Sequence, residues 1–118
     1  MLRVYSYKGC DSCRKALQWL GGQGIAFENL PIRETPPSVE ELESMLGFYQ
    51  GELKKLFNVS GQDYRSLGMK DRLPTMSQEA AIRLLSENGN LIKRPFAIAK
   101  DAGRVGFKPA EWEERFGG

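Results

Sequence analysis

The two cysteines of the chain, Cys10 and Cys13, stand three residues apart where an apolar segment gives way to a helical pattern. Residues 2–7 are rich in β-branched and aromatic side chains in loose alternation, which is typical of a strand. From Ser12 onward, apolar residues recur at helical spacing. Residues 25–30 then predict a second strand. A crossover of this length predicts a right-handed βαβ unit with parallel strands and the cysteines at its first turn.

Glycines and turn residues divide the rest of the chain. Gly21-Gly22 and Gly24 are expected to stop the first helix. Ser38 and Glu41 form a capping box that predicts the start of another helix. Further helical segments are expected near residues 52–57, 63–67 and 77–86, with a loop at 73–76. Residues 96–99 and 104–107 predict a hairpin around a turn at 101–103, and Pro109 predicts the first turn of a last helix.

This order is β-α-β, then a helical insertion at about 38–86, then β-β-α. It predicts an α/β fold, with a four-stranded mixed sheet flanked by helices as in thioredoxin and glutaredoxin. The helical insertion is too short to bury a core alone. We therefore expect residues 1–118 to form a single domain.

Composition limits the classes of function. The 118 residues carry 17 basic and 15 acidic side chains, a net charge of +2, and no basic run that would indicate direct nucleic-acid binding. No apolar stretch approaches the length of a membrane span, and no signal-peptide pattern opens the chain. These features predict a cytoplasmic protein, which we expect to be a monomer. The chain has no histidine, so a Cys-His pair, a Ser-His-Asp triad and a His-ligated zinc site are excluded.

The cysteine pair predicts redox chemistry. Cys10 is placed at the N-terminus of the helix, where free amides and the helix dipole favour a thiolate, so its pKa is expected to be depressed. Cys13 lies one turn inside, is expected to be less exposed and less acidic, and can form a disulfide with Cys10. The same amides form a site for an anion beside the nucleophile, to which Asp11 and Ser12 contribute. Two other interpretations remain, namely two buried small hydrophobes or half of a zinc site shared between chains.

Arg94-Pro95 forms a second cluster of interest directly before a predicted strand. The peptide bond is either cis, which would turn Arg94 and the Pro95 backbone toward a neighbouring loop, or a plain trans bond that opens an edge strand. Tyr7, before the cysteine loop, either lines the pocket or packs in the sheet. Lys54-Lys55 is interpreted as a solvated face.

These segments resemble one known family. The stretches at 7–17, 53–58, 64–67, 91–95 and 105–107 are similar to the glutaredoxin-coupled arsenate reductases and their Spx relatives. The resemblance implies a thioredoxin-like fold and a cis proline, here Pro95. It also implies a nucleophilic cysteine, matched by Cys10, and three arginines around an oxyanion, of which only Arg94 is matched. Arg65 and Lys108 are candidate substitutes for the other two.

The Cys10–Cys13 pair is instead similar to Spx, a redox-sensing transcription regulator that binds RNA polymerase. The chain most resembles the small arsenate reductase-like proteins between these groups. We predict a thiol-dependent oxidoreductase that acts on a small thiol or an oxyanion such as arsenate, with Cys10, Cys13 and Arg94 catalytic. Asp11, Ser12, Arg94 and Pro95 are expected to bind the anion. No metal or bound cofactor is expected, and glutathione, thioredoxin or glutaredoxin is the expected reductant. The alternative is an Spx-like regulator.

Overall fold

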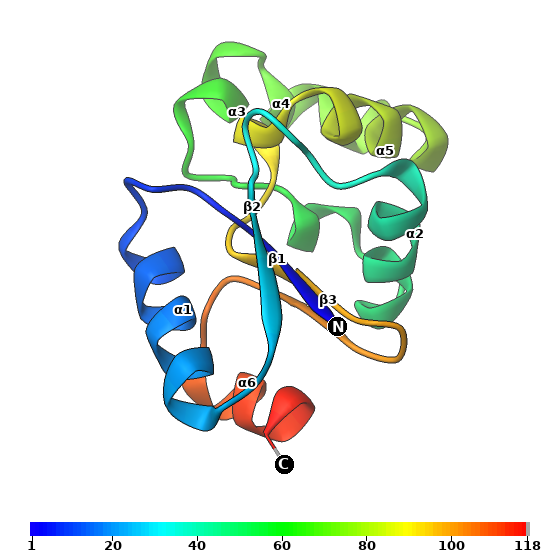
Figure 1. The fold of residues 1–118 in the computed structure, drawn as a ribbon. Helices are drawn as coiled ribbons and strands as arrows, with labels where there is room; N and C mark the ends of the chain where they lie inside the picture. The colour runs from blue at the N-terminus through cyan, green and yellow to red at the C-terminus, as the bar shows by residue number, and fades with distance from the viewer. Residues whose placement is uncertain (118) are drawn as a thin grey trace.

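The sheet begins as the first thirty residues predict. In the computed structural model, which describes residues 1–117, β1 (Leu2–Ser6) pairs in parallel with β2 (Phe27–Pro31), and α1 (Asp11–Gln23) connects them. On its other side β1 pairs antiparallel with β3 (Phe96–Ile98), which pairs antiparallel with β4 (Gly103–Val105). The strand order is β2-β1-β3-β4. The predicted thioredoxin-like mixed sheet is confirmed (Figure 1).

The chain between β2 and β3 is helical. Its elements are α2 (Val39–Phe48), η1 (Leu53–Leu56), α3 (Gln62–Ser66), α4 (Met69–Arg72), η2 (Leu73–Thr75), α5 (Gln78–Glu87) and η3 (Gly89–Leu91), and α6 (Pro109–Phe116) follows β4. The capping box of Ser38 and Glu41 is present at the start of α2, as predicted. The predicted loop at 73–76 is wrong in part, because a short 3-10 turn occupies most of it. None of the helices in residues 1–117 has the length and apolarity that a membrane crossing needs.

The end of α1 lies later than its glycines predict. Gly21 and Gly22 lie within the helix, and the chain leaves it at Gly24, whose φ of 71° is left-handed. Glycine lowers helix stability by only about 1 kcal/mol relative to alanine. The burial of Leu20 holds this last turn against the sheet. The helix therefore ends where a left-handed residue can cap its carbonyls, with the Gly24 amide donating to Gly21 and Leu20.

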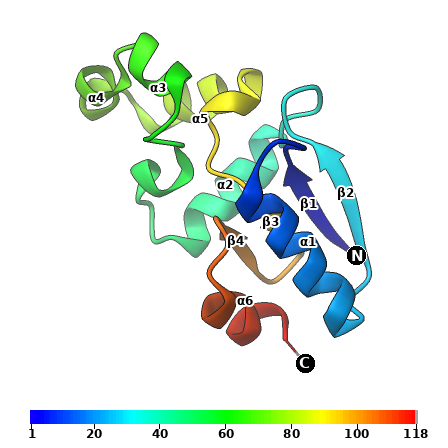
Figure 2. The ribbon, with the colours of Figure 1, turned by 90° about the vertical axis from the view of Figure 1, so that its left-hand side faces the viewer.

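The sheet separates two apolar clusters, because successive strand residues face opposite sides. Tyr5, Phe96 and Ile98 belong to the larger cluster, with residues of α2 and α5. Val4 and Ala97 belong to the smaller one, with residues of α1 and α6. Figure 1 shows α1 and α2 on opposite sides of the sheet, and Figure 2 shows α3 to α5 gathered at the end away from α6. The first turn of α1 thus lies beside the helical segment.

The hairpin differs in detail from the sequence pattern. Gly103, predicted in the turn, is the first residue of β4, and Phe107, predicted in the strand, lies beyond it. The Phe107 ring packs edge-on against Trp112 of α6, with ring centroids 5.1 Å apart. The Arg94-Pro95 peptide bond is cis, which settles the choice that the sequence left open.

Candidate functional site

Cys10 is the N-cap residue of α1. Its φ and ψ of −105° and 118° are extended, and its Sγ accepts a hydrogen bond from the Cys13 amide over 3.3 Å. The Cys10 amide itself donates to the Tyr7 carbonyl over 3.1 Å. The side chain is half-buried and lines a pocket.

Cys13 lies one turn further along and faces the core. Its side chain is 1% exposed, and its Sγ accepts from the Tyr7 amide over 3.5 Å. Burial, followed by the hydrogen bond with Cys10, raises the pKa of the Cys13 thiol to about 12. The positive charge of Arg94 opposes this rise. As expected from the sequence, Cys13 is the less exposed of the two, and both are free thiols in the structure.

The pocket next to Cys10 has a volume of about 810 Å³. Among the predicted site residues, Cys10, Ser12 and Arg94 line it. Asp11 is exposed outside this lining, and its carboxylate pairs with Arg14 over 2.7 Å. Pro95 is buried behind the lining, and its carbonyl accepts from the Gly106 amide over 2.9 Å.

Five cationic side chains line this pocket against two carboxylates. The cations are Lys54, Lys55, Lys93, Arg94 and Lys108, and the carboxylates are Glu52 and Glu111. The interpretation of Lys54-Lys55 as a solvated face alone is therefore incomplete, because both exposed lysines also face the cysteine pocket. No local pattern predicts this placement, since η1 reaches the pocket only through long-range packing.

The two candidate substitutes for the missing arginines differ in position. Lys108 lines the pocket, with its Nζ 3.8 Å from Glu111 Oε2. Arg65 is exposed on α3 outside the pocket lining, and its guanidinium donates to the Ser60 carbonyl over 3.4 Å. The structure therefore keeps Lys108 as a candidate and gives no support to Arg65.

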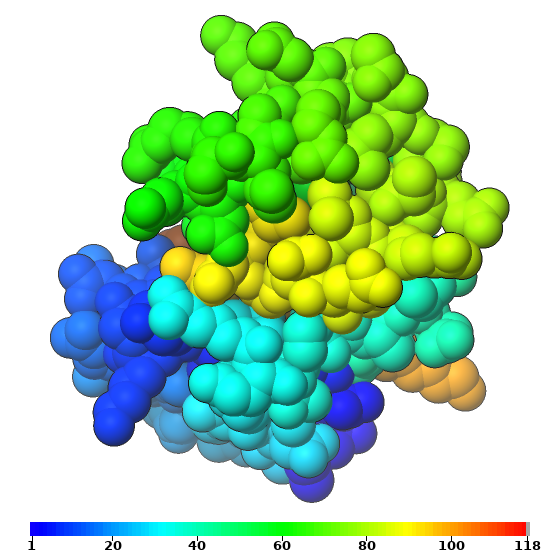
Figure 3. All heavy atoms as spheres, turned by 90° about the horizontal axis from the view of Figure 1, so that it is seen from above, coloured from blue at the N-terminus to red at the C-terminus, as the bar shows by residue number. Residues whose placement is uncertain are grey.

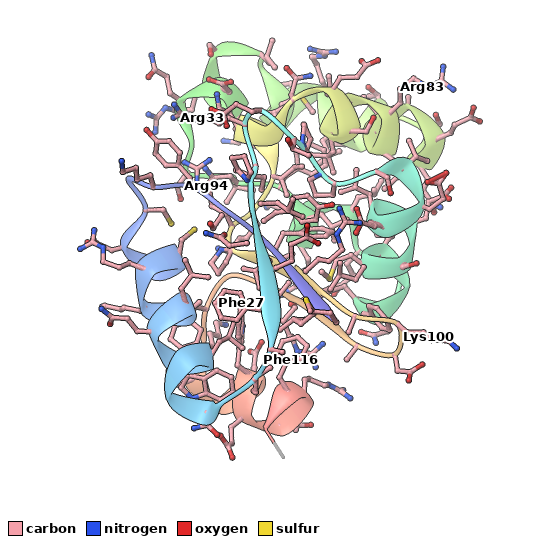
Figure 4. All side chains as sticks on the ribbon, viewed as in Figure 1. Phe27, Arg33, Arg83, Arg94, Lys100 and Phe116 are labelled. Atoms are coloured by element: carbon pink, nitrogen blue, oxygen red, sulfur yellow. The ribbon has the colours of Figure 1, made fainter. Side chains whose placement is uncertain are left out.

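Tyr7 holds two guanidinium groups over its ring. The Cζ of Arg33 lies 3.8 Å from the ring centroid, and the Cζ of Arg94 lies 5.1 Å from it. Figure 4 shows both arginines at the same end of the molecule. One guanidinium nitrogen of Arg94, Nη1, is buried with no hydrogen-bond partner among the described residues. Sequence reasoning missed Arg33, which follows β2 and offers no local signal.

Glycine makes room for this arrangement. A Cβ at Gly9 would lie only 2.9 Å from Cε2 of Tyr7. The ring therefore lies directly over the loop that carries Cys10. Tyr7 neither lines the pocket nor packs only in the sheet, the two roles that the sequence suggested. It links the cysteine loop to Arg94 instead.

Among the described residues, no group of three or more cysteine, aspartate and glutamate side chains lies close enough to hold a metal ion. The site is thus a pair of thiols, one in a cationic pocket and one in the core, joined by the first turn of a helix on a thioredoxin-like sheet. These features define a class of α/β proteins that carry a cysteine at a helix N-terminus on a thioredoxin-like sheet.

The chain belongs to the ArsC family, whose model matches residues 5–115. It is 41% identical to the uncharacterised protein YusI of Bacillus subtilis (strain 168), over 98% of each chain. It is 29% identical to the global transcriptional regulator Spx of Streptococcus agalactiae serotype V, over 94% of this chain and 80% of that protein. The structure of a possible arsenate reductase from Streptococcus mutans UA159 superposes with a TM-score of 0.85 at 37% identity, covering 92% of each chain. The similar proteins thus include both a regulator and a protein described as a possible arsenate reductase.

Proposed function

We propose that this protein is a thiol-dependent oxidoreductase in which Cys10 attacks the substrate and Cys13 resolves the intermediate. The observation that carries the proposal is the position of Cys10 Sγ, which lies at the N-terminus of α1, accepts the Cys13 amide and borders a cationic pocket. Arg94 and Ser12 line the same pocket and can stabilise negative charge on the sulfur or the substrate.

Thiol-disulfide exchange with an organic disulfide follows from this geometry. The Cys10 thiolate attacks one sulfur of the substrate, a Cys10–substrate disulfide forms, and the other half leaves as a thiolate. Cys13 then loses its proton and attacks Cys10 Sγ, so that the second half leaves and a Cys10–Cys13 disulfide forms. The substrate is reduced by two electrons. Glutathione or a dithiol protein such as thioredoxin or glutaredoxin restores the two thiols, and we place this cycle in the cytoplasm.

Reduction of arsenate is the second reaction within this proposal. The Cys10 thiolate displaces water from arsenate and forms a sulfur–arsenic bond. A second thiol, from Cys13 or glutathione, then attacks Cys10 Sγ. The sulfur–arsenic bond breaks with its electron pair left on arsenic, so arsenic goes from +5 to +3 while a disulfide forms. The similarity to the possible arsenate reductase supports this reaction, and the single matched arginine, Arg94, makes it the weaker of the two.

The test is an assay of purified protein with bis(2-hydroxyethyl) disulfide, and separately with arsenate, glutathione and glutaredoxin. The matched control is Cys10→Ser. We expect turnover of the disulfide that Cys10→Ser abolishes. The oxidoreductase proposal fails if the protein turns over neither substrate, or if Cys10→Ser retains the rate of the native protein.

A redox-sensing regulator is the second candidate, favoured by the similarity to Spx along most of the chain. In that case the Cys10–Cys13 disulfide would control contact with a protein partner such as RNA polymerase. Binding of the reduced and oxidised protein to an isolated domain of the polymerase α-subunit distinguishes the two. Affinity that changes with the redox state and is lost in Cys10→Ser would support the regulator, whereas no binding in either state would exclude this partner.

A further inference from the structure

The pocket is much larger than the chemistry at Cys10 requires. Its volume of about 810 Å³ is in the range that holds drug-sized ligands. A disulfide bond or a single tetrahedral oxyanion would fill only the end beside Cys10. The remaining volume reaches η1 and the start of α6, where Lys54, Lys55 and Lys108 line it. The pocket therefore has room for a part of the substrate that extends well beyond its sulfur.

The charge of the pocket indicates the chemistry of the part of the substrate that lies beyond its sulfur. No carboxylate of the described residues lies within 4.0 Å of the side-chain nitrogens of Lys54, Lys55, Lys93 or Arg94. Lys108 shares Glu111 with Arg104. Several cations in one concave surface raise the local concentration of anions and favour ligands with more than one negative charge. The whole chain has a net charge of only +2, so this concentration is local to the pocket.

The lysines of η1 are held at a set position relative to Arg94. The Lys93 amide donates to the Leu56 carbonyl over 2.8 Å, and the Asn58 amide donates to the Leu91 carbonyl over 2.8 Å. These bonds frame a bridge between Phe57 and Ile92. Seen from above, the green segment after η1 lies against the yellow segment before β3, with the blue segment around α1 next to them (Figure 3). The two segments that carry the cations therefore form one wall.

Aromatic groups supply the apolar part of the pocket. Tyr49 lines it from the C-terminal end of α2, and its hydroxyl accepts from the Val105 amide over 3.1 Å. Phe107 also lines it, and its ring packs against Trp19 and Trp112. Cationic groups beside aromatic surfaces suit an organic anion better than a hydrated inorganic one.

We propose that the substrate is an organic disulfide whose non-sulfur part carries several negative charges, with Lys54 and Lys55 binding that part while Cys10 attacks the sulfur. The inference rests on the thiol exchange described under Proposed function. The shared chemistry is a polyanionic disulfide, and the charges come either from carboxylates or from phosphates. Lys54 and Lys55 are then residues that determine specificity.

Binding tests the inference without any need for turnover. The Cys10→Ser protein is titrated by isothermal calorimetry with oxidised glutathione, which carries carboxylates, with coenzyme A disulfide, which carries phosphates, and with bis(2-hydroxyethyl) disulfide, which is uncharged. We expect at least one polyanionic disulfide to bind at least tenfold more tightly than the uncharged one. The disulfide that binds more tightly identifies whether the pocket recognises carboxylates or phosphates. Equal binding of all three, or no binding of either polyanion, overturns the inference.

The lysines are tested by a double variant with a matched control. Lys54→Ala with Lys55→Ala is compared with Lys70→Ala with Lys100→Ala, which removes two exposed lysines outside the pocket lining. In the Cys10→Ser background, we expect the first pair to weaken binding of the preferred polyanion at least tenfold and the control pair to change it less than twofold. Equal losses in both pairs would contradict the role of η1.

Kinetics separate this inference from the proposed function. With Cys10 intact, the ratio of kcat/KM for the preferred polyanion to that for the uncharged disulfide should fall at least tenfold in the Lys54→Ala, Lys55→Ala protein. A Cys10-dependent rate with an unchanged ratio overturns the inference and leaves the oxidoreductase standing. Tight, lysine-dependent binding without any Cys10-dependent rate would support the proposed binding site and contradict the proposed oxidoreductase function.

Discussion

The two ends of the first turn of α1 carry the same side chain in opposite environments. Cys10 is half-buried beside a cationic pocket, whereas Cys13 is 1% exposed in the core. The Cys13 amide donates to Cys10 Sγ, while burial raises the pKa of the Cys13 thiol to about 12. Within one helical turn, one thiol borders the pocket and the other is buried in the core, although the two are near neighbours.

The difference teaches how one turn can separate two steps of a reaction. A thiol that meets substrate has to be accessible and easily ionised, and Cys10 has the accessible position. A thiol that resolves a mixed disulfide has to reach only its neighbour, so it can stay buried and protonated until that disulfide forms. Tyr7 lies between the two, since its carbonyl accepts from Cys10 and its amide donates to Cys13.

Removal of the buried Cys13 thiol should give the largest effect, because it leaves the proposed attack by Cys10 without the resolving step. In Cys13→Ser, Cys10 still attacks a disulfide, but no second sulfur can release the product. We expect the release of the second thiol of the substrate in a single turnover to slow on the order of a hundredfold and the Cys10–substrate disulfide to accumulate. Intact-mass spectrometry after reaction with bis(2-hydroxyethyl) disulfide measures the adduct. The native protein is the control and should show an internal disulfide instead.

An adduct on Cys13 in the Cys10→Ser protein, formed as fast as the adduct on Cys10, would contradict the comparison. It would mean that burial does not shield the second thiol. The same measurement on both single variants therefore tests both ends of the turn.

Tyr7→Leu should have an intermediate effect. It removes the aromatic face beneath Arg94, a contact worth about 1 to 2 kcal/mol for a partly desolvated cation. The guanidinium is then free to leave the pocket, and we expect kcat/KM for an anionic disulfide to fall roughly tenfold. Steady-state kinetics with anionic and uncharged disulfides measure it, and the anionic substrate should lose more.

Tyr7→Phe is the matched control, because it keeps the ring and removes only the hydroxyl. It should retain nearly the full rate. A loss in Tyr7→Phe as large as that in Tyr7→Leu would show that the ring does not act through Arg94. Equal losses for anionic and uncharged disulfides in Tyr7→Leu would indicate a general disturbance of the cysteine loop.

Alkaline pH should give no sharp loss of activity but a gradual fall in stability. An ordinary thiol ionises near pH 8.5 in the unfolded chain, while Cys13 stays protonated in the folded protein until about pH 12. Between these values the unfolded state binds fewer protons, so the free energy of unfolding falls as pH rises. The fall due to Cys13 is at most about 1.4 kcal/mol per pH unit.

Urea unfolding of the native protein and of Cys13→Ala between pH 8 and pH 10.5 measures this fall. Burial, followed by the hydrogen bond to Glu41, also raises the pKa of Tyr5, which therefore adds to the slope of both proteins. The difference between the two slopes isolates Cys13. Parallel curves would contradict the raised pKa of this thiol.

Local sequence patterns predicted most of the secondary structure and the pairing of the first two strands. The capping box of Ser38 and Glu41 depends on residues three apart, so the sequence alone determines it. The parallel pairing of β1 and β2 follows from a crossover too long for a hairpin and is confirmed. Of the glycines predicted to stop α1, Gly21 and Gly22 lie inside the helix and only Gly24 caps it, because the packing of Leu20 outweighs the low helix propensity of glycine.

The site was predictable only where it is local. Cys10 and Cys13 were found from their spacing and their place before a helix. Lys54 and Lys55 were assigned to a solvated face, because nothing in η1 indicates that it is bonded to the segment before Arg94. Arg33 gave no signal, since its contact with Tyr7 joins residues 26 positions apart, at the end of β2 and the end of β1.

By itself, then, the sequence determined the secondary structure around the cysteines, the chemistry open to a chain without histidine, and the order of strands and helices. These depend on residues within one or two turns of each other. Only the tertiary structure decided which charges surround Cys10, that the peptide bond before Pro95 is cis, and that Tyr7 joins the thiols to Arg94. Those features require segments that are distant in the chain to pack together. The free energy of that packing comes from the whole core, so no single segment determines it.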